Sequence, residues 1–231
     1  MSINRESIED MVKKGLVEDI FKMECAFELG KKIGERSGDL NRNVNGYFGE
    51  LFATIQSALR IESILAAARV YDTPSKKYPT RCLRGVLNYL IENKDDLPKI
   101  REPYQLQIHL EHMSAPRELV NTIKNQPTEF ASQFSFFVQS LLETPFRIDT
   151  LEKLKLVRDK AIAHNEQVEE IVGPTWESLQ DLINIAKDVV GTLGWAYFST
   201  GYVINGDYIL SDDARRSSVA LNKLLNLIYN Q

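Results

Sequence analysis

Apolar residues recur at spacings of three and four along almost the whole chain, and this periodicity limits the folds open to it. One face of an α-helix collects residues at such spacings, whereas a half-buried strand needs apolar and polar residues to alternate. Alternating runs bounded by turn residues are nearly absent. The sequence therefore predicts an all-α fold, and its 231 residues suffice for a single helical domain, 1–231, with a substantial core.

Breakers and caps set the expected helix ends. The stretch from Arg5 to Arg36 predicts a first helix, and Val44–Tyr71 predicts a second that ends at Asp72-Thr73-Pro74, because the residue before a proline leaves the helical region. Asp149, with Glu152 three residues later, has the spacing of a capping box and predicts the start of a helix that ends near Asn165. Further helical stretches are expected at 80–92, 104–125 and 127–142, from 174 onward, and at 212–229.

Three segments need separate interpretations. Residues 200–211 hold two apolar triplets around Asn205-Gly206, which predicts a small β-hairpin near the C-terminus. The uncharged run Val189–Gly206 is interrupted by glycines and is expected to be a buried helix rather than a membrane anchor. Four phenylalanines between 130 and 137 predict a core cluster, with a partner interface as the alternative.

Charge and cysteine content restrict the partners. The chain has 28 Lys and Arg against 32 Asp and Glu, and a net charge of −4 gives no global attraction to phosphate backbones or anionic membranes. Contact with nucleic acid must therefore be local. Two cysteines cannot form a disulfide framework, and acidic residues in the first thirty positions do not fit a secretory signal, so a cytoplasmic protein is expected.

The most informative stretch is Leu156–Asn165, which contains Arg158, Asp159 and His164. On an α-helix, Arg158 and His164 point roughly 120° apart and lie about 9 Å apart along the axis, on either side of an apolar strip. Such a helix suits packing against its own symmetry mate, with each copy offering Arg and His to one shared cleft. The alternative is a structural role, with Arg158 at the helix C-terminus and His164 as a satisfied core residue.

This stretch resembles the signature of the HEPN superfamily, in which an Arg followed by a polar residue precedes a His near the end of a late helix. Ala66–Asp72, at the end of the second predicted helix, is similar to the abortive-infection U-type (AbiU-like) branch. The resemblance covers approximately 44–190, with helical extensions at both ends. It implies a HEPN-like helical bundle and a homodimer.

The activity that the resemblance implies is a metal-independent endoribonuclease of a phage-defence or toxin–antitoxin system, without a cofactor. His164 would transfer protons, Arg158 would stabilise the transition-state phosphate, and Asp159 would orient one of them. An antitoxin or other protein partner is a further expectation. The alternative function is a non-catalytic HEPN module that binds RNA, nucleotide or a protein.

Local positive charge supplies the candidate RNA contacts. Lys155 and Lys160 lie on the motif helix, and Arg81 and Arg84 belong to a second basic cluster with Lys76 and Lys77. A solvated helix face is the alternative meaning of both groups. No metal site is expected, because His109 and His112 lie three apart without a third ligand, which favours an ordinary amphipathic surface.

Overall fold

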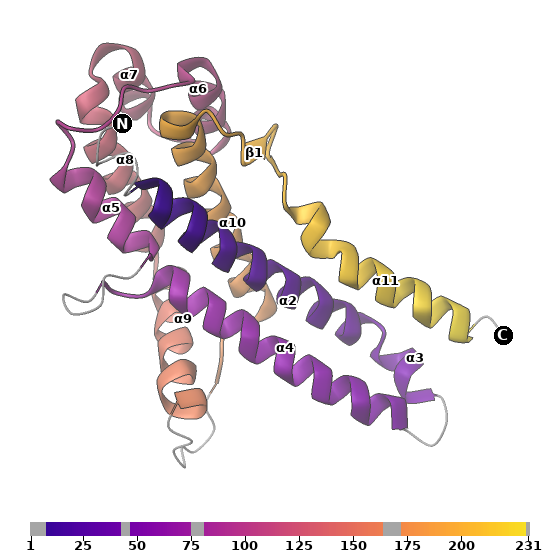
Figure 1. Cartoon of the computed structure of the whole chain (residues 1–231). Coiled ribbons are helices and arrows are strands. Elements are labelled where there is room, and N and C mark those ends of the chain that lie inside the picture. Colours follow the sequence, from indigo (N-terminus) through magenta and orange to yellow (C-terminus); the bar gives the residue numbers. More distant parts are fainter. Residues whose placement is uncertain (1–7, 43–46, 75–80, 164–171, 230–231) are drawn as a thin grey trace.

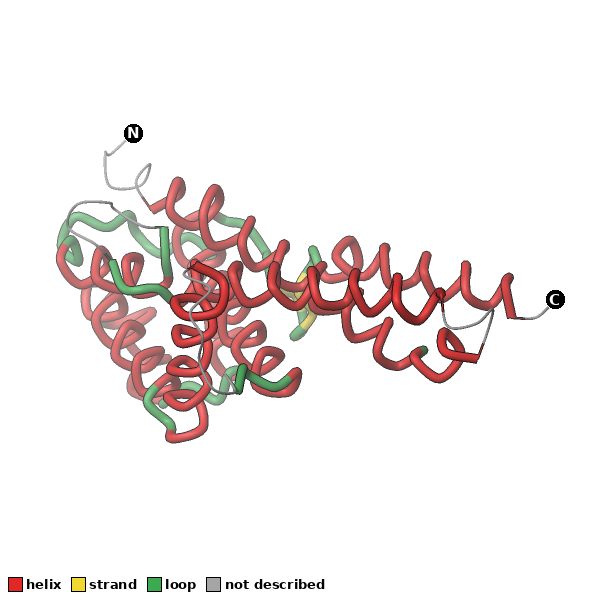
Figure 2. Tube along the Cα trace, turned by 90° about the horizontal axis from the view of Figure 1, so that it is seen from below, coloured by secondary structure: helices red, strands yellow, loops and turns green. Residues whose placement is uncertain are grey.

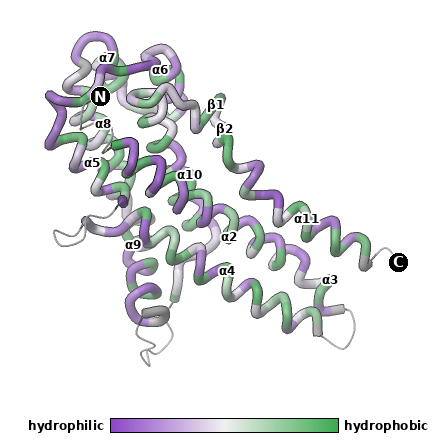
Figure 3. The backbone as a smooth tube through the Cα atoms, in the orientation of Figure 1, coloured by the Kyte–Doolittle hydropathy of each residue, from purple (hydrophilic) through white to green (hydrophobic). Residues whose placement is uncertain are grey.

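The computed structural model describes residues 8–42, 47–74, 81–163 and 172–229 (Figure 1). Within these residues the chain is all-α, as predicted, apart from one two-stranded antiparallel sheet. In Figure 3, hydrophobic residues recur along the helices between hydrophilic ones, as the spacings of three and four in the sequence predict. The elements in chain order are η1 (Val12–Leu16), α2 (Val17–Glu35), α3 (Ser37–Arg42), α4 (Tyr47–Tyr71), α5 (Leu83–Glu92), α6 (Pro103–His112), α7 (Arg117–Asn125), α8 (Pro127–Leu142), α9 (Pro145–Leu156), η3 (Val157–Ala163), α10 (Trp176–Leu193), η4 (Gly194–Phe198), β1 (Val203–Ile204), β2 (Asp207–Tyr208) and α11 (Ser211–Tyr229).

The helices α2 and α4 lie side by side over much of their length, and α11 packs along α2 (Figure 1). The distal parts of α2 and α4, together with α3 and α11, extend away from the other helices as an arm (Figure 2). A small apolar cluster holds the arm together and is separate from the main core. Its buried members are Ile33, Leu40, Leu221 and Leu225.

The main core is built on an inward apolar stripe of the first predicted helix. Ile8, Val12, Leu16, Ile20 and Met23 are fully buried, at the spacings of three and four that the sequence shows. Burial of each such side chain contributes about 1.5–3 kcal/mol before the entropy of ordering is subtracted. This stripe therefore anchors η1, the residues before it and the start of α2 against the rest of the molecule.

One buried polar cluster joins three helices. The carboxylate of Glu24 on α2 is only 1% exposed and accepts hydrogen bonds from the Lys187 ammonium on α10 and from the Ser211 hydroxyl at the start of α11. Lys187 Nζ also donates to Ser211 Oγ at 2.9 Å. A buried charge is tolerated only when it is paired, so this cluster requires all three elements to be in register.

The hairpin prediction is confirmed. β1 and β2 pair antiparallel, with Val203 opposite Tyr208, and the turn between them is Asn205-Gly206. Both turn residues have positive φ, 53° and 85°, which is the conformation that a two-residue hairpin turn requires and that Asn and Gly adopt most easily. The uncharged run Val189–Gly206 is helical and largely buried as far as Phe198. Its remaining residues form a loop, strand β1 and the hairpin turn.

Several predicted boundaries were wrong. The helix expected to begin at Asp149 begins one turn earlier, because Thr144 caps it through a hydrogen bond to the Arg147 amide and Pro145 fits its first turn. The stretch 104–125 is two helices, α6 and α7, separated at Ser114, which has a φ of 56°.

Arg147 forms a two-pronged ion pair with Asp181, which fixes α9 against α10.

The phenylalanine cluster is mostly core. Phe130 and Phe134 are fully buried and stack with ring centroids 5.7 Å apart, and Phe137 packs against the main core. Phe136 is 62% exposed, so the alternative interpretation as an interface applies to this residue only.

The apolar residues of α4 are only partly covered. Leu51 and Ala58 of α4 are exposed, because no helix of the described structure packs over that side of the arm. By length and composition alone, residues 48–71 are also long and apolar enough to cross a membrane, although core helices of soluble proteins pass the same test.

Candidate functional site

The motif segment continues α9 but changes its winding. Residues 157–163 form a π-helical stretch, η3, rather than the α-helix assumed for the Arg158–His164 geometry. The angle of 120° between these two side chains assumes an α-helix, and the described residues do not test it. π-Helical turns are rare and concentrate at functional sites, where an extra residue in the turn changes the direction of a side chain. His164 itself lies outside the described residues, as do Lys76 and Lys77.

Arg158 is held by two carboxylates. Its Nε donates to Asp159 Oδ1 at 2.7 Å, and its Nη1 lies 3.1 Å from Asp72 Oδ1. The Asp159 hydrogen bond is the main reason that the pKa of Arg158 is raised, with Asp72 adding to it and partial burial opposing it. The guanidinium is thus always charged and is fixed in direction from two sides.

Sequence reasoning missed Asp72 as a member of this site. It lies just beyond the last residue of α4, and its Oδ1 also accepts from the Thr73 backbone amide at 2.8 Å. The signal was available in the helix-ending Asp72-Thr73-Pro74, since an Asp at such a break often bonds its neighbouring backbone. Its pairing with Arg158 joins positions 86 apart in sequence, and no local pattern reports such a contact.

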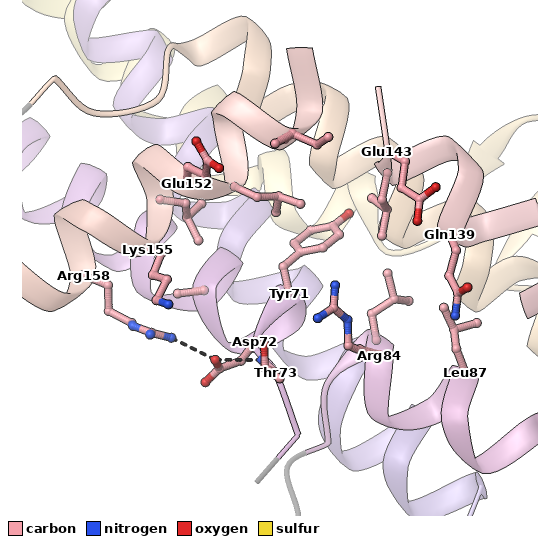
Figure 4. Close-up of a pocket in the computed structure, with 16 residues that line it drawn as sticks. Tyr71, Asp72, Thr73, Arg84, Leu87, Gln139, Glu143, Glu152, Lys155 and Arg158 are labelled. Atoms are coloured by element: carbon pink, nitrogen blue, oxygen red, sulfur yellow. Dashed lines mark hydrogen bonds and ion pairs between the residues drawn. The ribbon is translucent and has the colours of Figure 1, made fainter. Parts of the chain in front are cut away.

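A cavity of about 440 Å³ opens beside Arg158 (Figure 4). The ends of α4 and α8 and the helices α5 and α9 supply its walls. The Tyr71 ring is one wall, and its hydroxyl donates to the Leu182 carbonyl of α10 at 2.5 Å. Burial raises the pKa of Tyr71 far above its usual range, so this residue is a neutral structural wall.

The cavity brings together some of the predicted RNA contacts. Arg84 and Lys155 line it with Arg158 (Figure 4), and within the described residues neither Arg84 nor Lys155 has an ion pair. Arg81 does not line the cavity, because its Nε donates to Asp10 Oδ2 at 2.8 Å. Lys160 lies on η3 and is engaged by another group. Of the four predicted RNA contacts, the cavity therefore brings together Lys155 from the motif helix and Arg84 from the second basic cluster.

Carboxylates balance these cations. Asp72, Glu143 and Glu152 also line the cavity, so three acidic side chains accompany Arg84, Lys155 and Arg158. An anion that enters must compete with Asp72 for the guanidinium of Arg158. Since Asp72 and Arg158 are 39% and 26% exposed, this pair is worth only about 0.2–1 kcal/mol, and the competition is a mild one.

Of the two histidines expected on an amphipathic surface, His112 is exposed but His109 is not. His109 is buried, and its Nε2 lies 2.9 Å from the Asp188 carbonyl oxygen. Burial lowers the pKa of His109, which keeps the ring neutral. Within the described residues, no group of three or more His, Cys, Asp or Glu side chains is placed to hold a metal ion.

A family comparison bears directly on the motif. The HEPN family model described as AbiU2 matches residues 40–221, which is most of the chain. The chain belongs to the AbiU2 family of HEPN domains. No curated protein and no solved structure matches it.

The family assignment confirms the resemblance to the AbiU-like branch of the HEPN superfamily and identifies an abortive-infection-related HEPN domain. The AbiU2 match contains the whole of 44–190 and continues through the hairpin into α11. The cavity beside Arg158 also lies inside the matched region.

Proposed function

We propose that this AbiU2-family protein is an endoribonuclease of an abortive-infection or toxin–antitoxin system, with its active site around Arg158. The observation that supports this proposal best is the arrangement of Arg158, Arg84 and Lys155 along one cavity of a chain with a net charge of −4. Three carboxylates cancel the net charge of the cavity, but Arg84 and Lys155 have no ion pair within the described residues and are therefore available to bind a phosphate backbone.

The proposed reaction is attack of a ribose 2′-hydroxyl on the adjacent phosphorus. The O2′–P bond forms, the P–O5′ bond breaks, and the products are a 2′,3′-cyclic phosphate and a 5′-hydroxyl. His164 takes the 2′-hydroxyl proton or gives one to the leaving oxygen, since imidazole titrates near neutrality. Arg158 stabilises the charge on the non-bridging phosphate oxygens.

Asp159 and Asp72 act on Arg158 rather than on the substrate. Their two contacts fix the guanidinium plane before RNA arrives. When a phosphate binds, it replaces Asp72 at Nη1, while Asp159 retains Nε. Two copies of the chain are proposed to place their Arg158 and His164 in one shared cleft, which doubles the local positive charge.

The test is cleavage of a labelled single-stranded RNA by the purified protein, with and without a chelator. The proposal expects a 2′,3′-cyclic phosphate end in both, and at least a 100-fold loss of rate in Arg158→Ala and His164→Ala. Lys153→Ala is the matched control, because Lys153 lies on the same helix as Lys155 but pairs with Asp149 outside the cavity. RNA binding without cleavage by the unmutated protein would instead identify a non-catalytic module.

A further inference from the structure

The cavity beside Arg158 has more structure than a phosphate site needs. Its floor is apolar, with the buried side chains of Leu83, Leu87 and Leu154 among the residues that line it. Its volume of about 440 Å³ lies within the range of about 300–1,000 Å³ that is typical of small-molecule pockets. A phosphate backbone alone would gain nothing from these apolar walls, so the cavity suits a ligand with a flat, apolar part.

The polar groups of the cavity lie at its two ends, and Asp72 and Glu152 accompany the cations at one of them (Figure 4). In Figure 4, Lys155 and Arg158 lie at one end, Gln139 and Glu143 lie at the other, and Arg84 points between them. Within the described residues, the side chains of Gln139 and Glu143 have no hydrogen-bond partner. One end thus offers the cations Lys155 and Arg158 to a phosphate, and the other end offers the hydrogen-bonding groups of Gln139 and Glu143. Both ends border the apolar floor.

We propose that this cavity binds one unpaired nucleobase of a nucleoside phosphate, with its phosphate at the Arg158 end and its base edge at Gln139 and Glu143. The inference rests on the proposed function, because it takes RNA as the source of the nucleotide. An unpaired base can enter such a cavity flat side down, as in other proteins that bind single-stranded RNA.

The carboxylate of Glu143 predicts which bases are preferred. A carboxylate accepts hydrogen bonds only, and the exocyclic amino groups of adenine, cytosine and guanine donate them. Uracil has one N–H on its pairing edge, flanked by two carbonyl oxygens that repel a carboxylate. The cavity therefore favours adenine and cytosine over uracil, and Glu143 is the residue that determines this specificity.

The experiment measures binding rather than cleavage. Fluorescein-labelled 2′-O-methyl oligonucleotides of adenosine, cytidine or uridine lack the attacking hydroxyl, so fluorescence anisotropy reports their affinity without turnover. The full-length protein should bind the adenosine and cytidine oligonucleotides at least about fivefold more tightly than the uridine one. Glu143→Gln should reduce this difference to less than about twofold, because an amide also donates to a carbonyl oxygen.

Glu152→Gln is the matched control, since it removes the same charge from the cavity at a different place (Figure 4) and should retain the base preference. Equal affinity of the unmutated protein for all three oligonucleotides would overturn the inference, and so would a preference that survives in Glu143→Gln. Competition with AMP, CMP and UMP distinguishes a nucleotide of RNA from a free nucleotide as the ligand. A free nucleotide that binds as tightly as the oligonucleotide would show that the cavity does not need the RNA chain for binding.

The two proposals fail differently. Base-selective binding without cleavage of ordinary RNA leaves the cavity assignment intact and removes the nuclease activity. Cleavage that depends on Arg158 but shows no base preference, in binding or at the cut sites, removes the cavity assignment alone. Absence of any binding by oligonucleotides or mononucleotides overturns both.

Discussion

Replacement of Asp72 by Asn tests whether this carboxylate competes with phosphate for Arg158. The Nη1–Oδ1 contact of 3.1 Å joins two partly exposed side chains. Asn keeps an accepting oxygen but not the charge, so loss of the ion pair should cost at most about 0.2–1 kcal/mol of folding stability. The same energy no longer opposes phosphate binding, and 1 kcal/mol corresponds to about a fivefold change in an equilibrium constant. Asp72→Asn should therefore bind RNA up to about fivefold more tightly. Asn retains the Oδ1 that accepts from the Thr73 amide, so the end of α4 should be unchanged.

The assay is titration of a labelled 2′-O-methyl oligonucleotide at fixed salt, with thermal unfolding of the same samples. Asp39→Asn is the matched control, because Asp39 pairs with Arg36 Nε at 2.7 Å with similar exposure but lies in α3, in the arm. It makes the same change in net charge away from the cavity. Unchanged or weaker binding by a folded Asp72→Asn protein would refute the reasoning, and an equal gain in Asp39→Asn would show that only net charge matters.

Three further predictions concern stability. Gly194→Ala should destabilise the protein by about 1–3 kcal/mol, because its Cβ would lie 2.3 Å from a backbone carbonyl oxygen. Gly38→Ala has open space around it and should stabilise the protein by up to about 1 kcal/mol. Urea unfolding measures both changes in stability, and changes of the same sign would contradict this reasoning. Lys187→Met should lower the free energy of unfolding by about 3–5 kcal/mol, because it leaves the buried Glu24 carboxylate without its cation. Addition of Glu24→Leu should recover much of this stability. A double variant no more stable than Lys187→Met would disprove the explanation. Burial depresses the pKa of His109, so below pH 6.5 the unfolded chain binds more protons than the folded protein. Stability should therefore fall as the pH falls below that value, and His109→Gln should make the fall shallower. Identical pH profiles of the unfolding midpoint for the two proteins would argue against this.

Local sequence signals explain why so much of the fold was predictable. The stripe Ile8, Val12, Leu16 and Ile20 predicts both the first helix and its buried face, because helical periodicity is a property of neighbouring residues. Asn205-Gly206 predicts the hairpin for the same reason, since its two positive φ values suit those two residues. The signals failed where two of them competed within a few residues, as Thr144 and Asp149 did for the start of α9.

The sequence by itself determined the helical class, the hairpin, and the family signature of Arg158, Asp159 and His164, since each depends on residues close together in the chain. Tertiary structure alone decided what surrounds Arg158. Asp72, Arg84, Glu143 and Lys155 come from four separate parts of the chain, and packing of α4, α5, α8 and α9 brings them to one cavity. Contacts across such separations depend on how whole helices pack, and helix packing is set by the shape of the entire core rather than by any local pattern.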